Sequence, residues 1–108
     1  MSWTLYRIVK TDPPTRVDFL SYEALGLLAR NPTPELLELW SGVSTYDGRE
    51  YLRVRARRRP DLGRYIVTLL IEDGGPIRVK QTGSNRRHHD IWGTPETIMA
   101  RVVAVEDV

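Results

Sequence analysis

The sequence predicts one small α+β domain over residues 1–108, with a central, mostly antiparallel sheet and three to four short helices. Two segments, 3–9 and 64–71, are rich in the β-branched and aromatic residues that favour strands. Threonine followed by proline, at 33–34 and again at 94–95, is typical of a helix N-terminus, where threonine caps and proline takes the first helical position. A chain of this length is sufficient for one hydrophobic core.

The N-terminal half is expected to hold one strand and two helices. Residues 3–9 form the strand, and the Asp-Pro-Pro sequence at 12–14 ends it because proline lacks a backbone donor and restricts the residue before it. Segment 19–28 has Ser21 as a candidate N-cap and apolar residues at helical spacing, which predicts a short helix. A second helix is predicted over 34–42, because its apolar residues form one face and glycine ends it.

Segment 47–59 has two interpretations. Apolar residues alternate with arginines from Leu52 to Arg57, as in a half-buried strand. However, Asp47 is followed three residues later by Glu50, as in a helix-starting box, and Ala, Leu, Arg and Glu are good helix formers. Pattern and propensity leave both interpretations open.

The C-terminal half is expected to contribute most of the sheet. Residues 64–71 are apolar on both faces, which predicts a central strand covered on both sides. The following segments are, in order, a turn and second strand over 72–80, a polar loop over 83–93, a helix from Pro95 and a last strand over 101–105.

Composition narrows the classes of protein to which the chain can belong. It has no cysteine, which excludes disulfides and thiolate metal sites and fits a reducing compartment. Its longest nearly apolar run, 66–71, is far shorter than the roughly 20 residues of a membrane helix, and its first residues lack the pattern of a signal peptide. No Walker loop or dinucleotide-binding glycine pattern is present. We therefore expect a cytoplasmic protein with no membrane association and no metal site.

Basic side chains concentrate in the C-terminal half. Of the 16 basic residues 14 are arginine, and the segment from Arg49 to Arg64 holds seven arginines against two acids. Such a cluster attracts phosphates, so one hypothesis is a nucleic-acid-binding module. Its candidate contacts are Arg53, Arg57, Arg58 and Arg59. The same pattern is also typical of a solvated helix face.

Two further segments carry side chains capable of chemistry. His88 and His89 are the only histidines, and Asp90 follows them. One interpretation is an imidazole oriented by Asp90 for acid–base work, and the other is a solvated turn. Segment 40–46 (WSGVSTY) combines small residues, hydroxyls and aromatics that can line a ligand pocket. Its alternative interpretation places Trp40 in the core and uses the remaining residues as helix caps.

Four segments, taken in their order along the chain, form a pattern that can be compared with known protein families. They are Tyr6-Arg7 in the first strand, the serine- and glycine-containing 41–46, the arginine-rich 47–60, and 62–66 at the start of a strand. In this order they resemble the core of the ADP-ribosyltransferase-like superfamily, including its shorter bacterial families. The resemblance covers most of residues 3–105 and favours a helix for segment 47–59.

The resemblance implies an enzyme that takes NAD as its substrate and either transfers ADP-ribose or cleaves the bond to nicotinamide. Arg7 would contact the phosphates or the ribose, and Tyr46 would stack on the nicotinamide ring. The implied NAD-binding residues are Tyr6, Arg7, Ser44, Thr45 and Tyr46. Such families use a glutamate on a late strand, and the implied catalytic candidates here are Glu106 and, in its place, His88 or His89.

Three hypotheses of function follow from the sequence. The NAD-using enzyme predicts that Arg7, Tyr46 and the two histidines converge on one concave pocket. The nucleic-acid module predicts one continuous basic face. The third hypothesis is a non-catalytic protein-interaction domain, forming a homodimer through tryptophan anchors at Trp3, Trp40 and Trp92.

Overall fold

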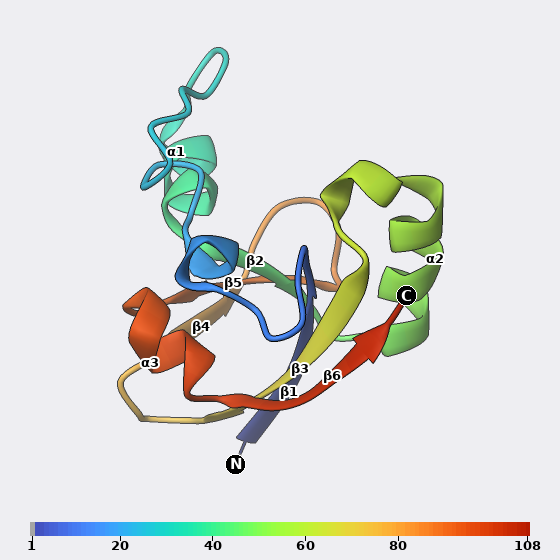
Figure 1. Cartoon of the computed structure of the whole chain (residues 1–108). Helices are drawn as coiled ribbons and strands as arrows, with labels where there is room; N and C mark the ends of the chain where they lie inside the picture. The colour runs from blue at the N-terminus through green and yellow to red at the C-terminus, as the bar shows by residue number, and fades with distance from the viewer. Residues whose placement is uncertain (1) are drawn as a thin grey trace.

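The computed structural model describes residues 2–108 and contains a six-stranded antiparallel sheet in the order β4-β5-β2-β1-β3-β6 (Figure 1). The strands are β1 (Ser2–Val9), β2 (Val43–Tyr46), β3 (Tyr65–Glu72), β4 (Arg78–Gln81), β5 (His88–Trp92) and β6 (Val102–Asp107). The helices are α1 (Pro34–Ser41), α2 (Arg49–Arg58) and α3 (Pro95–Met99), with two 3₁₀ turns, η1 (Arg16–Phe19) and η2 (Pro60–Leu62). The predicted α+β class is confirmed.

Both helices that begin with threonine and proline are confirmed in detail. Thr33 Oγ1 accepts a hydrogen bond from the backbone N–H of Leu36 at 3.1 Å and thereby caps α1. Thr94 Oγ1 caps α3 in the same way, through the N–H of Thr97 at 3.1 Å. Residues 49–58 of segment 47–59 form α2, so the helix that the resemblance favoured is confirmed and the strand interpretation is wrong. The expected box from Asp47 to Glu50 is not formed, because the N-cap is Gly48.

Three local predictions are wrong. Segment 19–28 forms turns rather than a helix, and Gly26 has a φ of 77°, which a right-handed helix does not allow. Residues 43–46 form β2 instead of a turn between helices. The expected polar loop over 83–93 contains β5, because β2 and β4 pair with it on both sides and this pairing overrides its polar composition.

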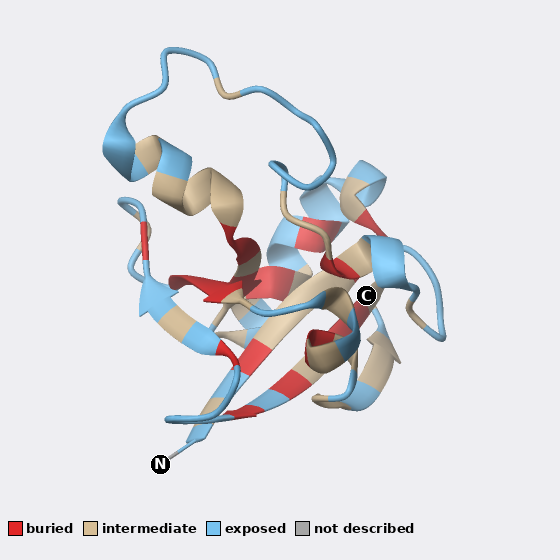
Figure 2. Cartoon of the chain, turned by 90° about the vertical axis from the view of Figure 1, so that its left-hand side faces the viewer, coloured by how far each residue is buried: buried red, intermediate tan, exposed pale blue. Residues whose placement is uncertain are grey.

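The main core lies on the sheet face that η1 and α3 cover. Its fully buried members are Leu5, Val9, Phe19, Val43, Val67, Leu69, Ile71, Ile77, Ile91 and Ile98, and Figure 2 shows buried positions concentrated along the central strands. Helix α2 packs against the opposite face, over β1, with Leu52 and Ala56 buried. The prediction that Trp40 belongs to the core is not met, since Trp40 is only half-buried on α1.

Strands β1 and β2 diverge in the middle of the sheet. β1 pairs with β3 along its whole length, from Ser2–Glu72 to Val9–Tyr65, but with β2 only at Tyr6–Tyr46. Beyond that pair the two strands separate and leave backbone groups of β2 without a ladder partner. We call this opening, between residues 7–9 of β1 and 43–45 of β2, the fork. Within residues 2–108, no helix has the length and apolar character needed to cross a membrane.

Candidate functional site

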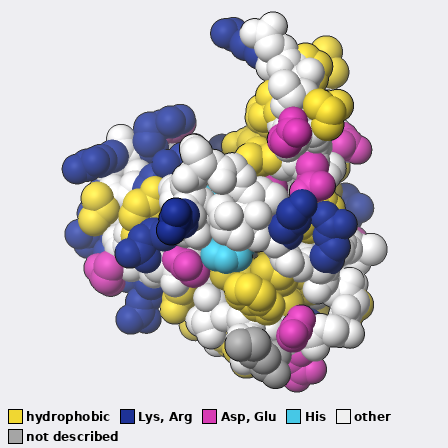
Figure 3. Space-filling view, turned by 180° about the vertical axis from the view of Figure 1, so that it is seen from behind, with side chains coloured by type: hydrophobic (Ala, Val, Ile, Leu, Met, Phe, Trp, Pro, Cys, Tyr) yellow, Lys and Arg dark blue, Asp and Glu magenta, His cyan; other side chains and the backbone are white. Residues whose placement is uncertain are grey.

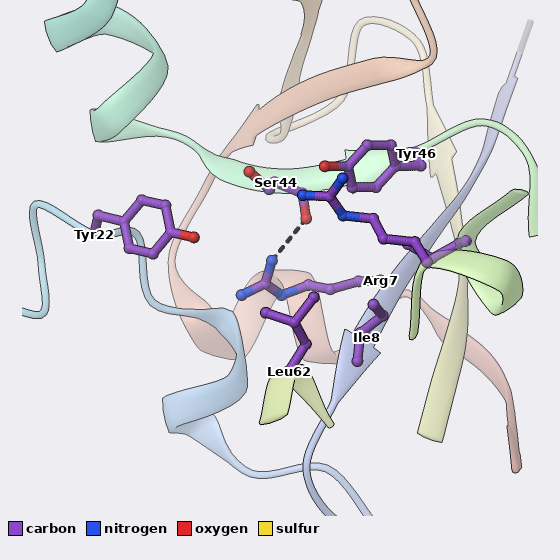
Figure 4. Close-up of a pocket in the computed structure, with 8 residues that line it drawn as sticks. Arg7, Ile8, Tyr22, Ser44, Tyr46 and Leu62 are labelled. Carbon is purple, nitrogen blue, oxygen red and sulfur yellow. Dashed lines mark hydrogen bonds between the residues drawn. The ribbon is translucent and has the colours of Figure 1, made fainter. Parts of the chain in front are cut away.

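A pocket opens at the fork between β1 and β2. Its volume is about 130 Å³, and an adjoining cavity of about 30 Å³ shares Arg7, Tyr22 and Ser44 with it. The pocket is lined by Arg7, Ile8, Tyr22, Ser44, Tyr46, Leu52, Arg55 and Leu62. Figure 4 shows Arg7 beneath Ser44, with Tyr22 and Tyr46 on either side. The sequence-derived site residues Arg7, Ser44 and Tyr46 are therefore brought together.

Arg7 holds the fork together with its guanidinium group. Its Nε donates to the carbonyl oxygen of Asp18 at 2.6 Å, and its Nη1 donates to the carbonyl oxygen of Ser44 at 2.7 Å (Figure 4). Burial lowers the pKa of Arg7, and nearby Tyr22 and Asp18 counteract this shift, so the side chain stays charged. The remaining nitrogen, Nη2, makes no hydrogen bond within residues 2–108.

The other side of the pocket is formed by an aromatic ring and a second cation. The guanidinium of Arg55 on α2 lies 5.5 Å from the centre of the Tyr46 ring, within the range of a cation–π interaction. Burial raises the pKa of the Tyr46 hydroxyl, and the charge of Arg55 offsets part of this shift. Tyr46 is therefore a neutral phenol at physiological pH. The pocket thus offers a ring face together with the positive charges of Arg7 and Arg55.

A chain of hydrogen bonds leads from Ser44 into the sheet. Ser44 Oγ lies 2.8 Å from Nε2 of His88, whose Nδ1 lies 3.1 Å from the carbonyl oxygen and 3.0 Å from Oγ1 of Thr82. Thr82 Oγ1 in turn donates to Oδ2 of Asp90 at 2.9 Å. Direct pairing of β2 with β5 places Tyr46 opposite His88 and Ser44 opposite Asp90, so all four side chains share one face of the sheet.

Asp90 is the deepest member of this chain. It is 0% exposed, and among residues 2–108 its Oδ1 has no hydrogen-bond partner, although it lies 3.7 Å from Nε2 of His88. Burial raises the pKa of Asp90, while the hydrogen bond from Thr82 and the proximity of His88 lower it in part. An added Cβ at Gly42 would lie 2.7 Å from Cβ of Asp90. Glycine at this position therefore allows β2 and β5 to approach each other around the buried acid.

Five of the candidate NAD-binding and catalytic residues do not line the pocket, and of these only His88 contacts a lining residue, Ser44, through a side-chain hydrogen bond within residues 2–108; the five are Tyr6, Thr45, His88, His89 and Glu106. Thr45 and His89 point to the opposite face from Ser44 and His88, because neighbours in a strand alternate. There Thr45 Oγ1 donates to the carbonyl oxygen of His89 at 2.7 Å, and the imidazole ring lies 5.5 Å from the ring of Trp3. Tyr6 pairs with Tyr46 across the strands but does not line the pocket.

Glu106 also lies outside the pocket. It is on β6, at the far edge of the sheet, where its carboxylate contacts Arg53 Nη2 at 3.1 Å and Arg49 Nε at 3.8 Å. We therefore assign it an ion-pairing role beside α2 and carry only His88 forward from the catalytic candidates.

The arginine-rich segment forms an exposed surface beside the pocket, and Figure 3 shows Lys and Arg side chains gathered on the side of α2. Arg57, Arg58 and Arg59 are exposed at the end of the helix, and Arg59 pairs with Asp61 at 2.9 Å. Arg53 forms an ion pair with Glu106, so the four candidate arginines are not equally available to bind a phosphate. Nucleic-acid binding and homodimer formation stay predictions.

Three residues of the site were not singled out from the sequence. Arg55 was one of many arginines, and only the helical conformation of 49–58 places it over Tyr46. Thr82 has no motif around it, and the pairing of β4 with β5 brings it to His88. Tyr22 reaches the pocket from the turns that replace the expected helix. Only its aromatic character was a usable signal.

Comparison with known proteins adds no identification. No protein family model matches the chain, and no curated protein or solved structure shows significant similarity to it. Across residues 2–108, no group of three or more His, Cys, Asp or Glu side chains is arranged to hold a metal ion. The interpretation of the site therefore depends on its geometry and on the resemblance drawn from the sequence.

Proposed function

We propose that the fork pocket binds NAD and that the chain is an ADP-ribosyltransferase-like enzyme, which transfers ADP-ribose or cleaves the bond to nicotinamide. The observation that carries the proposal is the convergence of Arg7, Ser44 and Tyr46 on one pocket, with His88 in contact with Ser44. These are four of the residues that the resemblance implied, and they come from three separate strands.

The chemistry of the lining suits one end of a dinucleotide. Arg7 and Arg55 supply positive charge for a phosphate or for the ribose hydroxyls next to it, and the Tyr46 ring supplies a face for nicotinamide. At about 130 Å³ the pocket is smaller than the roughly 300–1,000 Å³ typical of sites for whole ligands. NAD would therefore insert one end and extend over the surface next to Arg55.

Catalysis in this proposal depends on His88 rather than on a glutamate. Breaking the bond between ribose and nicotinamide gives a cationic, oxocarbenium-like centre, and an attacking hydroxyl or water must then lose a proton. The Ser44–His88 pair lies beside the pocket and can accept that proton at Nε2 of His88. Asp90, 3.7 Å from the same nitrogen, favours the resulting imidazolium.

The test combines binding and turnover. Saturating NAD at about 100 times its dissociation constant should stabilise the fold by about 2.7 kcal/mol, measured as a thermal shift. Nicotinamide release is then followed by chromatography. Arg55→Ala should weaken both signals, because Arg55 lines the pocket, whereas Arg58→Ala is a matched control on the same helix outside the lining. No thermal shift and no nicotinamide release from the wild-type protein at millimolar NAD would refute the proposal.

A further inference from the structure

We propose that Ser44 is a histidine-activated nucleophile that forms a covalent ester with a phosphoryl group of an anionic substrate. The inference uses the pocket of the proposed function but does not need NAD to be its ligand. It follows from the direction of the hydrogen bonds around His88, from the position of Ser44 on the pocket wall and from the two cations beside it.

The partners of His88 determine which of its nitrogens carries the proton. The carbonyl oxygen of Thr82, 3.1 Å from Nδ1, can only accept, so Nδ1 bears the hydrogen. Nε2 then has a free lone pair, and the hydroxyl of Ser44, 2.8 Å away, donates to it. This is the arrangement in which an imidazole removes a proton from a serine as the oxygen attacks.

Thr82 and Asp90 hold the imidazole in that orientation. Because Thr82 Oγ1 donates to Asp90, it has a lone pair left to accept from Nδ1 of His88 at 3.0 Å. The chain therefore runs in one direction, from Ser44 through His88 and Thr82 to Asp90. His88 and Thr82 are only 7% and 8% exposed, which restricts the imidazole to this orientation.

Charge near Ser44 indicates the class of substrate. Ser44 lines both the main pocket and the adjoining cavity, and Arg7 lines both with it. Arg55 adds a second positive charge to the main pocket. Guanidinium groups next to a nucleophile favour a negatively charged phosphoryl group over a neutral acyl group, because they stabilise the charge that builds on the phosphoryl oxygens.

The proposed step conserves atoms and charge. Ser44 Oγ attacks phosphorus, its proton passes to Nε2 of His88, and the bond from phosphorus to the leaving oxygen breaks. His88 returns the proton to the leaving oxygen, which departs as an alcohol, and the phosphoryl group stays on Ser44. Water then attacks phosphorus and gives its proton to Nε2 of His88, and the bond from phosphorus to Ser44 Oγ breaks. His88 returns the proton to Ser44 Oγ, so the phosphoryl group leaves as a phosphate product and the Ser44 hydroxyl is restored. Asp90 Oδ1, 3.7 Å from Nε2, stabilises the imidazolium formed in each half of the reaction.

The test labels the serine with diisopropyl fluorophosphate, which contains an electrophilic phosphorus and releases fluoride. The native protein should gain one diisopropylphosphoryl group, located on Ser44 by peptide mass spectrometry. Ser44→Ala should remove the label, and Ser41→Ala should keep it, because the Ser41 hydroxyl contacts Glu38 and Trp92 rather than a histidine. His88→Gln should slow labelling by about 100-fold, the lower end of the effect of general-base catalysis.

A second pair of variants keeps the test interpretable if His88→Gln fails to fold. Thr82→Val keeps the shape of the side chain and the backbone carbonyl but removes the hydroxyl. It should slow labelling by about tenfold, less than the loss of the general base itself, because His88 is still present but is oriented less well. Thr82→Ser restores the hydroxyl and should restore the rate. An absent label, a label on other serines, or equal rates in all Thr82 variants would overturn the inference. Because the reagent contains no nucleotide, failure of the protein to bind NAD leaves the labelling result valid.

Discussion

Arg7 is predicted to stabilise the sheet as well as bind a ligand, and the stability of Arg7→Met without ligand measures the first of these roles. Methionine keeps an unbranched apolar stem but removes the donors to the carbonyl oxygens of Asp18 and Ser44. A hydrogen bond from a charged donor contributes about 1.5–3 kcal/mol, so two of them contribute roughly 3–6 kcal/mol. Burial of the guanidinium opposes this contribution, as the lowered pKa of Arg7 indicates. We therefore expect a net loss of roughly 2–4 kcal/mol in the free energy of unfolding.

Urea denaturation followed by tryptophan fluorescence measures this loss, provided that the m value stays the same. Arg16→Met is the matched control, because the Arg16–Glu96 ion pair is exposed on both sides, and the midpoint should not move. An Arg7→Met protein within about 0.5 kcal/mol of the wild type, the usual scatter for a surface substitution, would refute a bracing role for Arg7 at the fork. If the loss is observed, ligand binding by Arg7 variants has to be measured below their own unfolding midpoints.

Two further predictions concern Trp40 and Asp90. Trp40→Ala should lower the free energy of unfolding by less than the roughly 3–5 kcal/mol typical of a buried tryptophan. The reason is that the indole is half-buried and donates to the carbonyl oxygen of Leu27 on an exposed segment. A larger loss in urea denaturation would contradict this placement. Burial raises the pKa of Asp90 in the folded state, so folding disfavours its charged form. The stability of the wild type relative to Asp90→Asn should therefore fall as the pH rises above about 3.9, the usual aspartate value, and level off above the folded-state pKa. A difference that stays constant from pH 3 to 8 would contradict the raised pKa.

Sequence patterns predicted the structure correctly where it depends on residues that are close together in the chain. The caps at Thr33 and Thr94 act within one helical turn, and both could be identified from the threonine–proline pairs. The strand around Ile66 was identified because its residues are apolar on both faces. Arg7 and Ser44 were identified by resemblance, which gave their roles but not the bond between them.

Sequence signals failed where distant strands determine the structure. β5 begins with three polar residues, His88 to Asp90, and its pairing with β2 and β4 makes it a strand. The connection from His88 to Asp90 passes through Thr82, whose position depends on the register of β4. The expected helix over 19–28 failed for the opposite reason. A helix at this position would have no surface to pack against, since leucines such as Leu28, which is 92% exposed, lie in solvent.

The fork also has a mechanical consequence. The sheet consists of two three-stranded units, β4-β5-β2 and β1-β3-β6, the second with a register shift between Thr68 and Leu69. One registered residue pair, the guanidinium of Arg7 and a hydrophobic core common to both units join them. Because one registered residue pair joins β1 to β2, the resistance to separating the two units comes mainly from the shared core and from Arg7. A ligand that contacts Arg7 and Ser44 together would clamp the two units. Backbone amides of β2 that face the fork should then exchange with deuterium more slowly, while those between β1 and β3 keep their rates.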